Sequence, residues 1–225
     1  VNDSYTTPHN TPVVLNPLQG DTDPENDALS ITSINGVTLT PGTAQSIPVT
    51  NGVVTVAADG TITFTPNTGF VGQVSFPYTI SDGHGGTSQA IETITITNTA
   101  PAAVNDNYTT PHNTPVVLNP LQGDTDPEND ALSITSINGV TLTPGTAQSI
   151  PVTNGVVTVA ADGTITFTPN TGFVGQVSFP YTISDGHGGT SQAIETITIT
   201  NTAPELTSGS ARVSEEGLVG GLADS

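Results

Sequence analysis

Basic side chains are almost missing from this sequence. Its 225 residues include one Lys or Arg, which is Arg212, against 20 Asp and Glu, and the formal net charge is −19. Salt bridges within the repeats described below therefore cannot relieve the repulsion between carboxylates. Nucleic acid is excluded as a partner, because binding it requires Lys and Arg to displace counterions. Attraction to an anionic membrane surface is excluded on the same ground.

Cysteine and long apolar runs are also missing. Without cysteine no disulfide can stabilise the fold, so an extracellular protein of this kind needs another source of rigidity. No apolar run approaches about 18 residues, so we expect no direct membrane insertion. No signal peptide is visible, and the chain reads as an excerpt that starts and stops within a pattern.

The chain is built from two nearly identical copies. Residues 1–101 match 104–204 with one mismatch, Ser4 against Asn107. This predicts two tandem domains, 1–103 and 104–206. Residues 207–225 break the pattern and are interpreted either as the truncated start of a different domain or as a tail. Identical copies in series favour a spacer, because a spacer gains length with each copy while an active site is rarely needed twice.

Alternating Val, Ile, Thr, Phe and Tyr between Gly and Pro argue against disorder and predict an all-β fold. We expect two Ig-like Greek-key sandwiches of about seven strands each, arranged end to end. An eighth strand would bring both termini to one end, so 35–44 is predicted to be an irregular excursion. The expected strands of repeat 1 are 3–16 (one strand interrupted at Pro8), 28–34, 45–50, 53–57, 61–66, 73–81 and 88–97.

The segment GDTDPENDAL occurs at 20–29 and again at 123–132. The count of strands predicts that it lies at the C-terminal end of its domain, whereas the turns at Asp59 and Asp82 lie at the N-terminal end. Its D-x-D-x-E-x-D spacing favours a calcium cage, because Ca²⁺ takes six to eight oxygen ligands in flexible geometry. Magnesium, which demands octahedral geometry, is less suited. The alternative is that these are solvated acidic turns.

Two further features have no settled reading from the residues alone. The sequence offers few ligands for a zinc site, because there is no cysteine and His9 and His84 have no evident partner. Glu92 shares strand parity with Ile94 and Ile96, which belong to the expected core. Either a bulge turns Glu92 outward, which we favour, or it is a metal ligand near the domain end.

The motifs AVNDNYTT, DTDPENDALSIT, DGTITFTPNTGFVG and FPYTISDGHGGTSQAIETITIT resemble the cadherin-like, immunoglobulin-fold repeats of giant bacterial RTX adhesins. The resemblance covers residues 1–206. It implies a calcium-loaded sandwich, type I secretion and a long stalk at the bacterial cell surface. Ice binding, known from such adhesins, is not implied, because no flat regular Thr array is present.

The resemblance carries calcium positions to Asp21, Asp23, Asp27, Asn98, Asn105, Asp106 and Asp185, and also to Glu25, Asp59 and Asp162. Residues at the start of each repeat, and residues at equivalent positions of the other repeat, are added to this set. The candidate Ca²⁺ ligands are then Asp3, Asp21, Asp23, Glu25, Asp27, Asp82, Asn98, Asn105, Asp106, Asp124, Asp126, Glu128, Asp130, Asp162, Asp185 and Asn201.

Three functional classes can be compared on this basis. The favoured one is a calcium-rigidified extender, monomeric, whose partners are the neighbouring repeats of the same chain. The second is an adhesion module that binds a glycan or a protein directly, but the sequence has no Trp for an aromatic platform. The third is an enzyme, which we do not expect. No nucleophile motif or phosphate loop is recognisable, and GHGG at 83–86 has no following helix.

Overall fold

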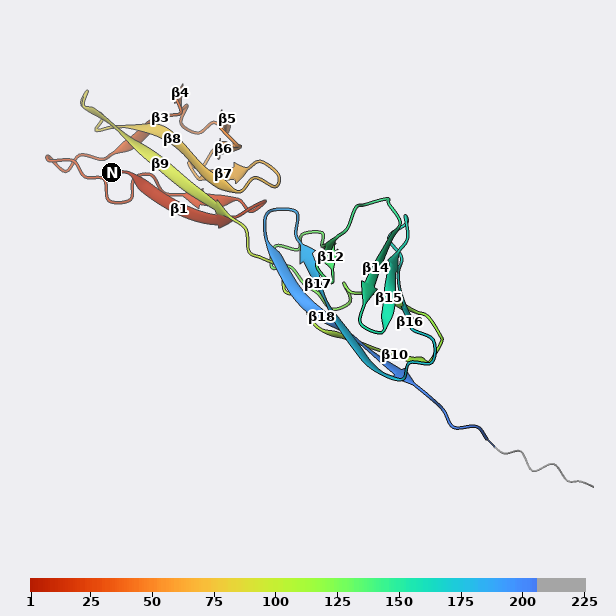
Figure 1. Ribbon diagram of the computed structural model, residues 1–225. Coiled ribbons are helices and arrows are strands. Elements are labelled where there is room, and N and C mark those ends of the chain that lie inside the picture. Colours follow the sequence, from red (N-terminus) through yellow and green to blue (C-terminus); the bar gives the residue numbers. More distant parts are fainter. Residues whose placement is uncertain (206–225) are drawn as a thin grey trace, which may run out of the picture.

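A computed structural model describes residues 1–205 as two β-sandwiches joined end to end (Figure 1). The described residues contain no helix that is long and apolar enough to cross a membrane. The predicted start of a further domain at 207–225 lies outside the described residues. The first sandwich ends with strand β9 (Thr87–Thr97), and the second begins with strand β10 (Asp106–Pro111).

Each repeat folds into a five-stranded sheet that faces a four-stranded sheet. In repeat 1 the sheet orders are β1-β9-β8-β3-β4 and β2-β7-β6-β5, and repeat 2 has the same topology. The remaining strands of repeat 1 are β1 (Asp3–Pro8), β2 (Val13–Leu15), β3 (Ser30–Ile34), β4 (Val37–Thr38), β5 (Gln45–Val49), β6 (Gly52–Val56), β7 (Ile62–Pro66) and β8 (Gly72–Ser81). Those of repeat 2 are β11 (Val116–Leu118), β12 (Ser133–Ile137), β13 (Val140–Thr141), β14 (Gln148–Val152), β15 (Gly155–Val159), β16 (Ile165–Pro169), β17 (Gly175–Ser184) and β18 (Thr190–Thr200).

The alternating runs form the predicted strands, and their inward residues make one core per repeat. In repeat 1 the largest fully buried side chains include Phe64, Tyr78, Ile34 and Ile94. The rings of Phe64 and Phe76 pack with centroids 6.3 Å apart. Burial of this apolar surface is the main term that stabilises each sandwich.

The segment 35–44 is not wholly irregular, which corrects the prediction. Asn35 and Gly36 take positive φ angles of 48° and 79°, as a tight hairpin turn requires. The short strand β4 then pairs antiparallel with β3, with Ile34 opposite Val37. Each repeat therefore has nine strands.

The chain also reverses between β1 and β2, where the sequence predicted one interrupted strand. Thr11 N donates to Pro8 O across a turn, and Asn10 has a positive φ of 58°. Past β2, Asn16 N donates to the Tyr5 hydroxyl, 2.9 Å away, so β2 runs back along β1. Together the two corrections raise the number of strands in a repeat from seven to nine. Nine is also odd, so the first and last strands still run in the same direction, and β1 is parallel to β9.

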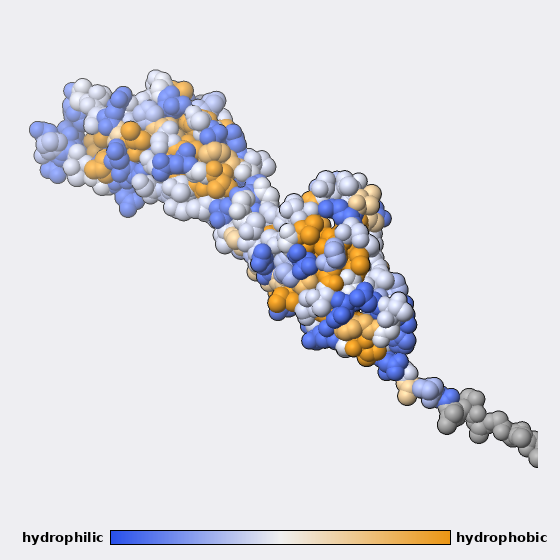
Figure 2. Space-filling view, in the orientation of Figure 1, coloured by the Kyte–Doolittle hydropathy of each residue, from blue (hydrophilic) through white to orange (hydrophobic). Residues whose placement is uncertain are grey.

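This reversal moves the acidic segment to the other end of the domain. Asp21 contacts the terminal amine of Val1 and accepts a hydrogen bond from Tyr78, so the segment 20–27 lies at the N-terminal end. The predicted C-terminal location is wrong, because one strand was counted where there are two. In Figure 2 hydrophilic residues gather at the end of repeat 1 that faces away from repeat 2. The segment 123–130 of repeat 2, in contrast, lies at the junction.

Candidate metal sites and the junction between the repeats

Glu195 is fully buried on the inner face of β18. It has the same inward parity as Ile197 and Ile199, and it pairs with Phe179 of β17 in an unbroken register. The register of β8 with β9 is unbroken as well, and Glu92 is equally buried. The predicted bulge at Glu92 is therefore wrong, and each repeat holds one carboxylate inside its core.

Unpartnered oxygens surround Glu195. Both of its carboxylate oxygens lack a hydrogen-bond partner, as does the buried Oδ2 of Asp106. Asp106 is the residue directly opposite Glu195 in the parallel pair of β10 and β18. The Tyr181 hydroxyl donates to Asp124, 3.2 Å from each carboxylate oxygen, and lies 2.8 Å from Val104 O. Unsatisfied buried oxygens are rare in folded proteins, and a bound ion or an ordered water is a usual partner for such atoms.

The ionisation of this internal carboxylate cluster (Asp106, Asp124 and Glu195) reflects the same crowding. Burial, together with the charges on Asp106 and Asp124, raises the pKa of Glu195 to about 8. Burial and the Asp124 charge also raise the pKa of Asp106. The pKa of Tyr181 is raised by burial and the neighbouring carboxylates, so its hydroxyl remains a donor. A cation placed among these groups would reverse each of these shifts.

Repeat 1 has the equivalent internal cluster, Asp3, Asp21 and Glu92. The Tyr78 hydroxyl lies 3.1 Å from Asp21 Oδ2 and 3.5 Å from Asp3 Oδ2. Both oxygens of Glu92 lack a partner. Burial and the charges on Asp3 and Asp21 raise the pKa of Glu92 to about 7. The arrangement therefore belongs to the repeat itself and not to one copy.

A second group of oxygens forms where the linker enters repeat 2. Asp126 Oδ1 accepts the backbone N–H groups of Glu128 and Asp130, at 2.9 and 3.1 Å, and its Oδ2 is buried without a partner. Asn98 Nδ2 donates to Asp185 Oδ2 at 2.7 Å, and Asn98 Oδ1 is left without a partner. Burial opposes ionisation of Asp185, but hydrogen bonds from Asn98 and the turn outweigh it and lower its pKa.

The linker is held directly by repeat 2. Thr99 donates from its hydroxyl to Glu128 at 2.8 Å, and Ala102 pairs with Thr125 in an isolated antiparallel bridge. Pro101, in the middle of the linker, is buried. The two repeats are therefore joined by a structured contact of backbone and side chains.

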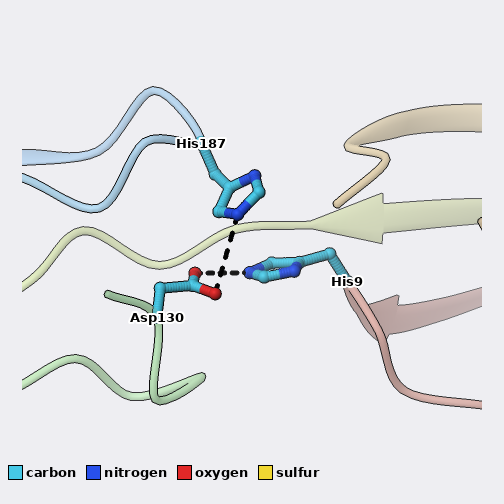
Figure 3. A group of neighbouring side chains, drawn as sticks. All are labelled: His9, Asp130 and His187. Atoms are coloured by element: carbon cyan, nitrogen blue, oxygen red, sulfur yellow. Dashed lines mark hydrogen bonds and ion pairs between the residues drawn. The ribbon is translucent and has the colours of Figure 1, made fainter. Parts of the chain in front are cut away.

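Two histidines and an aspartate meet across the junction (Figure 3). His9 comes from the turn after β1, Asp130 from the acidic segment of repeat 2, and His187 from the turn between β17 and β18. His9 Nε2 lies 2.8 Å from Asp130 Oδ2, and His187 Nε2 lies 3.6 Å from Asp130 Oδ1. In residues 1–205 this junction triad is the one group of three His, Cys, Asp or Glu whose ligand atoms all lie within 4.8 Å of one another.

Other predicted ligands make separate hydrogen bonds or are exposed. Asp162 accepts the N–H of Thr164 within its own turn, and Asn105 accepts the N–H of Ile194. Asn201 is exposed at the far end of repeat 2. In repeat 1 the acidic segment is at the end that faces away from repeat 2. There Asp23 accepts the backbone N–H groups of Glu25 and Asp27, and Glu25 is exposed. Asp82 accepts backbone N–H groups of its own turn.

Sequence reasoning weighed Glu92 as a metal ligand but favoured a bulge there, so neither Glu92 nor its counterpart Glu195 was among the candidate ligands, and it found no partner for His9. The parity of Glu92 with inward Ile residues was the available signal for the first. No sequence signal identified the second, because His9 and His187 are brought together only by the packing of one repeat on the next. The unpartnered atoms are all oxygens, which suits a hard cation such as Ca²⁺. The carboxylates of the internal clusters are not mutually within 4.8 Å, so a cation there would draw them together.

Comparison with known proteins gives a family match. The family model described as "Bacterial Ig domain" matches residues 1–97 and 98–200. A comparison with curated proteins gives no match.

Solved structures resemble the chain only distantly. An endo-fucoidan hydrolase of glycoside hydrolase family 107 is 20% identical over 80% of this chain and 24% of its own, with a TM-score of 0.30. Drosophila N-cadherin EC1-4 is 12% identical over 88% and 47%, with a TM-score of 0.29. The protocadherin GammaB4 extracellular domain is 15% identical over 90% and 31%, with a TM-score of 0.32. The chain thus spans about a quarter of the hydrolase.

Proposed function

The chain belongs to the bacterial Ig domain family, and from this premise we propose that its two repeats are calcium-rigidified extender modules of a secreted RTX adhesin. They would space a ligand-binding domain away from the bacterial surface, with no catalytic role. The observation that carries the proposal is the fully buried Glu195, whose two oxygens have no partner. A buried carboxylate without compensation is costly, so a cation that the repeat's own composition cannot supply would stabilise the fold.

Protein groups are poor candidates for that cation. The chain has a single Lys or Arg, Arg212, which lies outside the described residues. Because the internal cluster occurs in both repeats, one basic residue could not serve both copies, and the amine of Val1, which contacts Asp21 in repeat 1, has no counterpart in repeat 2. Calcium fits the donor set, since carboxylate, amide and backbone oxygens are its usual ligands.

The residues fall into two proposed calcium groups. The internal group is Asp106, Asp124 and Glu195 in repeat 2, with Asp3, Asp21 and Glu92 in repeat 1. The junction group is Asn98, Asp126 and Asp185, with Glu128 beside it. Calcium bound here would neutralise the carboxylates, tie the linker to repeat 2 and fix the angle between the repeats.

The mechanism follows from mass action. An ion that binds only the folded form stabilises it, and at tenfold excess over Kd each independent site contributes about 1.4 kcal/mol. Several such sites would rival the ~5–15 kcal/mol that stabilises a typical domain. Where calcium is scarce the repulsive chain would be less stable and easier to export, and in the extracellular medium it would gain stability and stiffen.

Small-angle X-ray scattering on the full chain tests the proposal, first in millimolar calcium and then in excess EDTA. We expect a rod in calcium that becomes a bent, compact or unfolded ensemble in EDTA. Asp126→Asn should weaken the change, whereas Asp162→Asn, at an exposed turn away from both groups, is the matched control. An unchanged scattering profile would refute the extender mechanism.

A further inference from the structure

The junction triad of His9, Asp130 and His187 differs in chemistry from the calcium groups. We propose that it is a separate site for a divalent transition metal of the zinc class, shared between the two repeats. Two imidazole nitrogens and one carboxylate oxygen are donors that Zn²⁺ prefers, whereas Ca²⁺ takes oxygen ligands. The proposal does not depend on calcium binding.

The geometry is close to what such a site requires. His9 is fully buried in its side chain, Asp130 is 11% exposed and His187 is 28% exposed, so the cluster is enclosed on one side and open on the other. In a tetrahedral zinc site with bonds of about 2.1 Å, ligand atoms lie about 3.4 Å apart. His9 Nε2 lies 2.8 Å from Asp130 Oδ2, and His187 Nε2 lies 3.6 Å from the other oxygen, Oδ1. One ligand atom from each of the three residues lies within 4.8 Å of the other two, so small shifts would bring three donors to the spacing of a zinc site. Water would fill the fourth position on the open side.

Packing holds both rings in place before any metal binds. The His9 and His187 ring centroids are 4.5 Å apart. His187 also lies against Gly69, where an added Cβ would be 2.8 Å from its Cε1 atom. Ring positions fixed by the fold reduce the ordering cost of binding an ion.

One hydrogen bond opposes the site and supplies its sharpest test. The Asn10 side chain accepts the N–H of Gly69 through Oδ1, at 2.7 Å, so its amide group faces His9 Nδ1, 2.8 Å away. Nδ1 is thus the acceptor, and the ring proton is on Nε2, directed at Asp130. A metal on Nε2 would move that proton to Nδ1, and the Asn10 amide would have to turn over.

Replacing Asn10 with aspartate removes this conflict. A carboxylate accepts both the Gly69 N–H and a proton on His9 Nδ1, which is the usual support for a metal-bound histidine. Asp tolerates the positive φ of 58° at this position. Asn10→Asp is therefore expected to tighten metal binding, even though residue 10 is not itself a ligand.

The chain contains its own matched controls, because repeat 1 carries counterparts of two triad residues and repeat 2 carries a counterpart of the third. His84 pairs with Asp27 at 3.7 Å and is 75% exposed, with no preceding repeat among the described residues to complete it. His112 occupies the turn equivalent to that of His9, with Asn113 beside it, at the end of repeat 2 that faces away from the junction. Variants at His84 and His112 alter the equivalent turns of the other repeat and leave the triad unchanged.

The test is titration of the full chain with Zn²⁺ by isothermal calorimetry, in saturating calcium at neutral pH. Co²⁺ is titrated in parallel, because its visible absorption reports four-coordinate nitrogen and oxygen ligation. We expect one zinc per chain and at least tenfold weaker binding in His9→Gln and in His187→Gln. His84→Gln and His112→Gln should bind as the parent does, and Asn10→Asp should bind at least threefold more tightly while Asn113→Asp does not.

Because His9 is buried, His187→Gln in the exposed turn keeps the test decisive if His9→Gln fails to fold. Absence of a one-to-one zinc isotherm would overturn the proposal. So would zinc affinity that is equal in His187→Gln and the parent chain, or weaker binding in Asn10→Asp. A failure of the calcium scattering test would leave this result unaffected, so the two proposals stand or fall separately.

Discussion

Replacing Glu195 with glutamine should make the metal-free protein more stable. The pKa of Glu195 is about 8 in the folded chain, against an ordinary value of 4.5. The folded state therefore retains a proton that the unfolded state has lost. Stability falls as pH rises from about 4.5 to about 8, and at pH 7 the loss from this one carboxyl is about 3 kcal/mol. Glutamine keeps the shape of the side chain without the ionisation.

The assay is urea unfolding in excess EDTA, followed by circular dichroism at several pH values. At neutral pH we expect repeat 2 of Glu195→Gln to unfold with a free energy of unfolding about 3 kcal/mol higher than in the parent chain, and the difference should vanish near pH 4. With calcium present the parent chain should be the more stable of the two, because the variant lacks one ligand and is stabilised less by the ion. If the variant is less stable than the parent in EDTA at neutral pH, the internal carboxylate is not destabilising, and the reasoning fails.

Four further substitutions test other contacts. Tyr181→Phe removes the hydroxyl that lies within hydrogen-bond distance of the Asp124 carboxylate and the Val104 carbonyl, and should lower the free energy of unfolding by about 1–3 kcal/mol in urea melts; no change would contradict this hydrogen bonding. Gly69→Ala and Gly172→Ala both place a side chain at positive φ, 69° and 75°, and should destabilise their own repeats alike. Only the added methyl group of Gly69→Ala would contact His187, so only this variant should widen the range of angles between the two repeats, as measured by scattering with calcium present. Equal scattering profiles for the two variants would show that Gly69 does not contribute to the junction. Asp162→Asn should leave the calcium dependence of melting unchanged, and a lost calcium response would place Asp162 in a site.

The sequence by itself determined the secondary structure and the class of fold. Alternation along 73–81 and 88–97, with Asn-Gly and Asp-Gly turns between other runs, specified strands because a period of two buries one face of a sheet. The near-perfect copy at 104–204 specified two such domains. The excess of carboxylates over basic residues indicated a cation, because no other charge was available to oppose them.

The tertiary structure decided where those carboxylates lie. A turn at Asn10 reverses the chain between β1 and β2, and this one reversal moves the acidic segment from one end of the domain to the other. The end of the domain at which a loop lies was predicted by counting strands, and each strand was assumed to reverse the chain direction. This count fails when a reversal falls within a run of residues that looks like one continuous strand. Glu195 had the parity of a core residue, but only the unbroken register of β17 with β18 showed it buried. His9 and His187 are far apart in sequence, and they meet because one sandwich packs on the next, which is a property that no local pattern encodes.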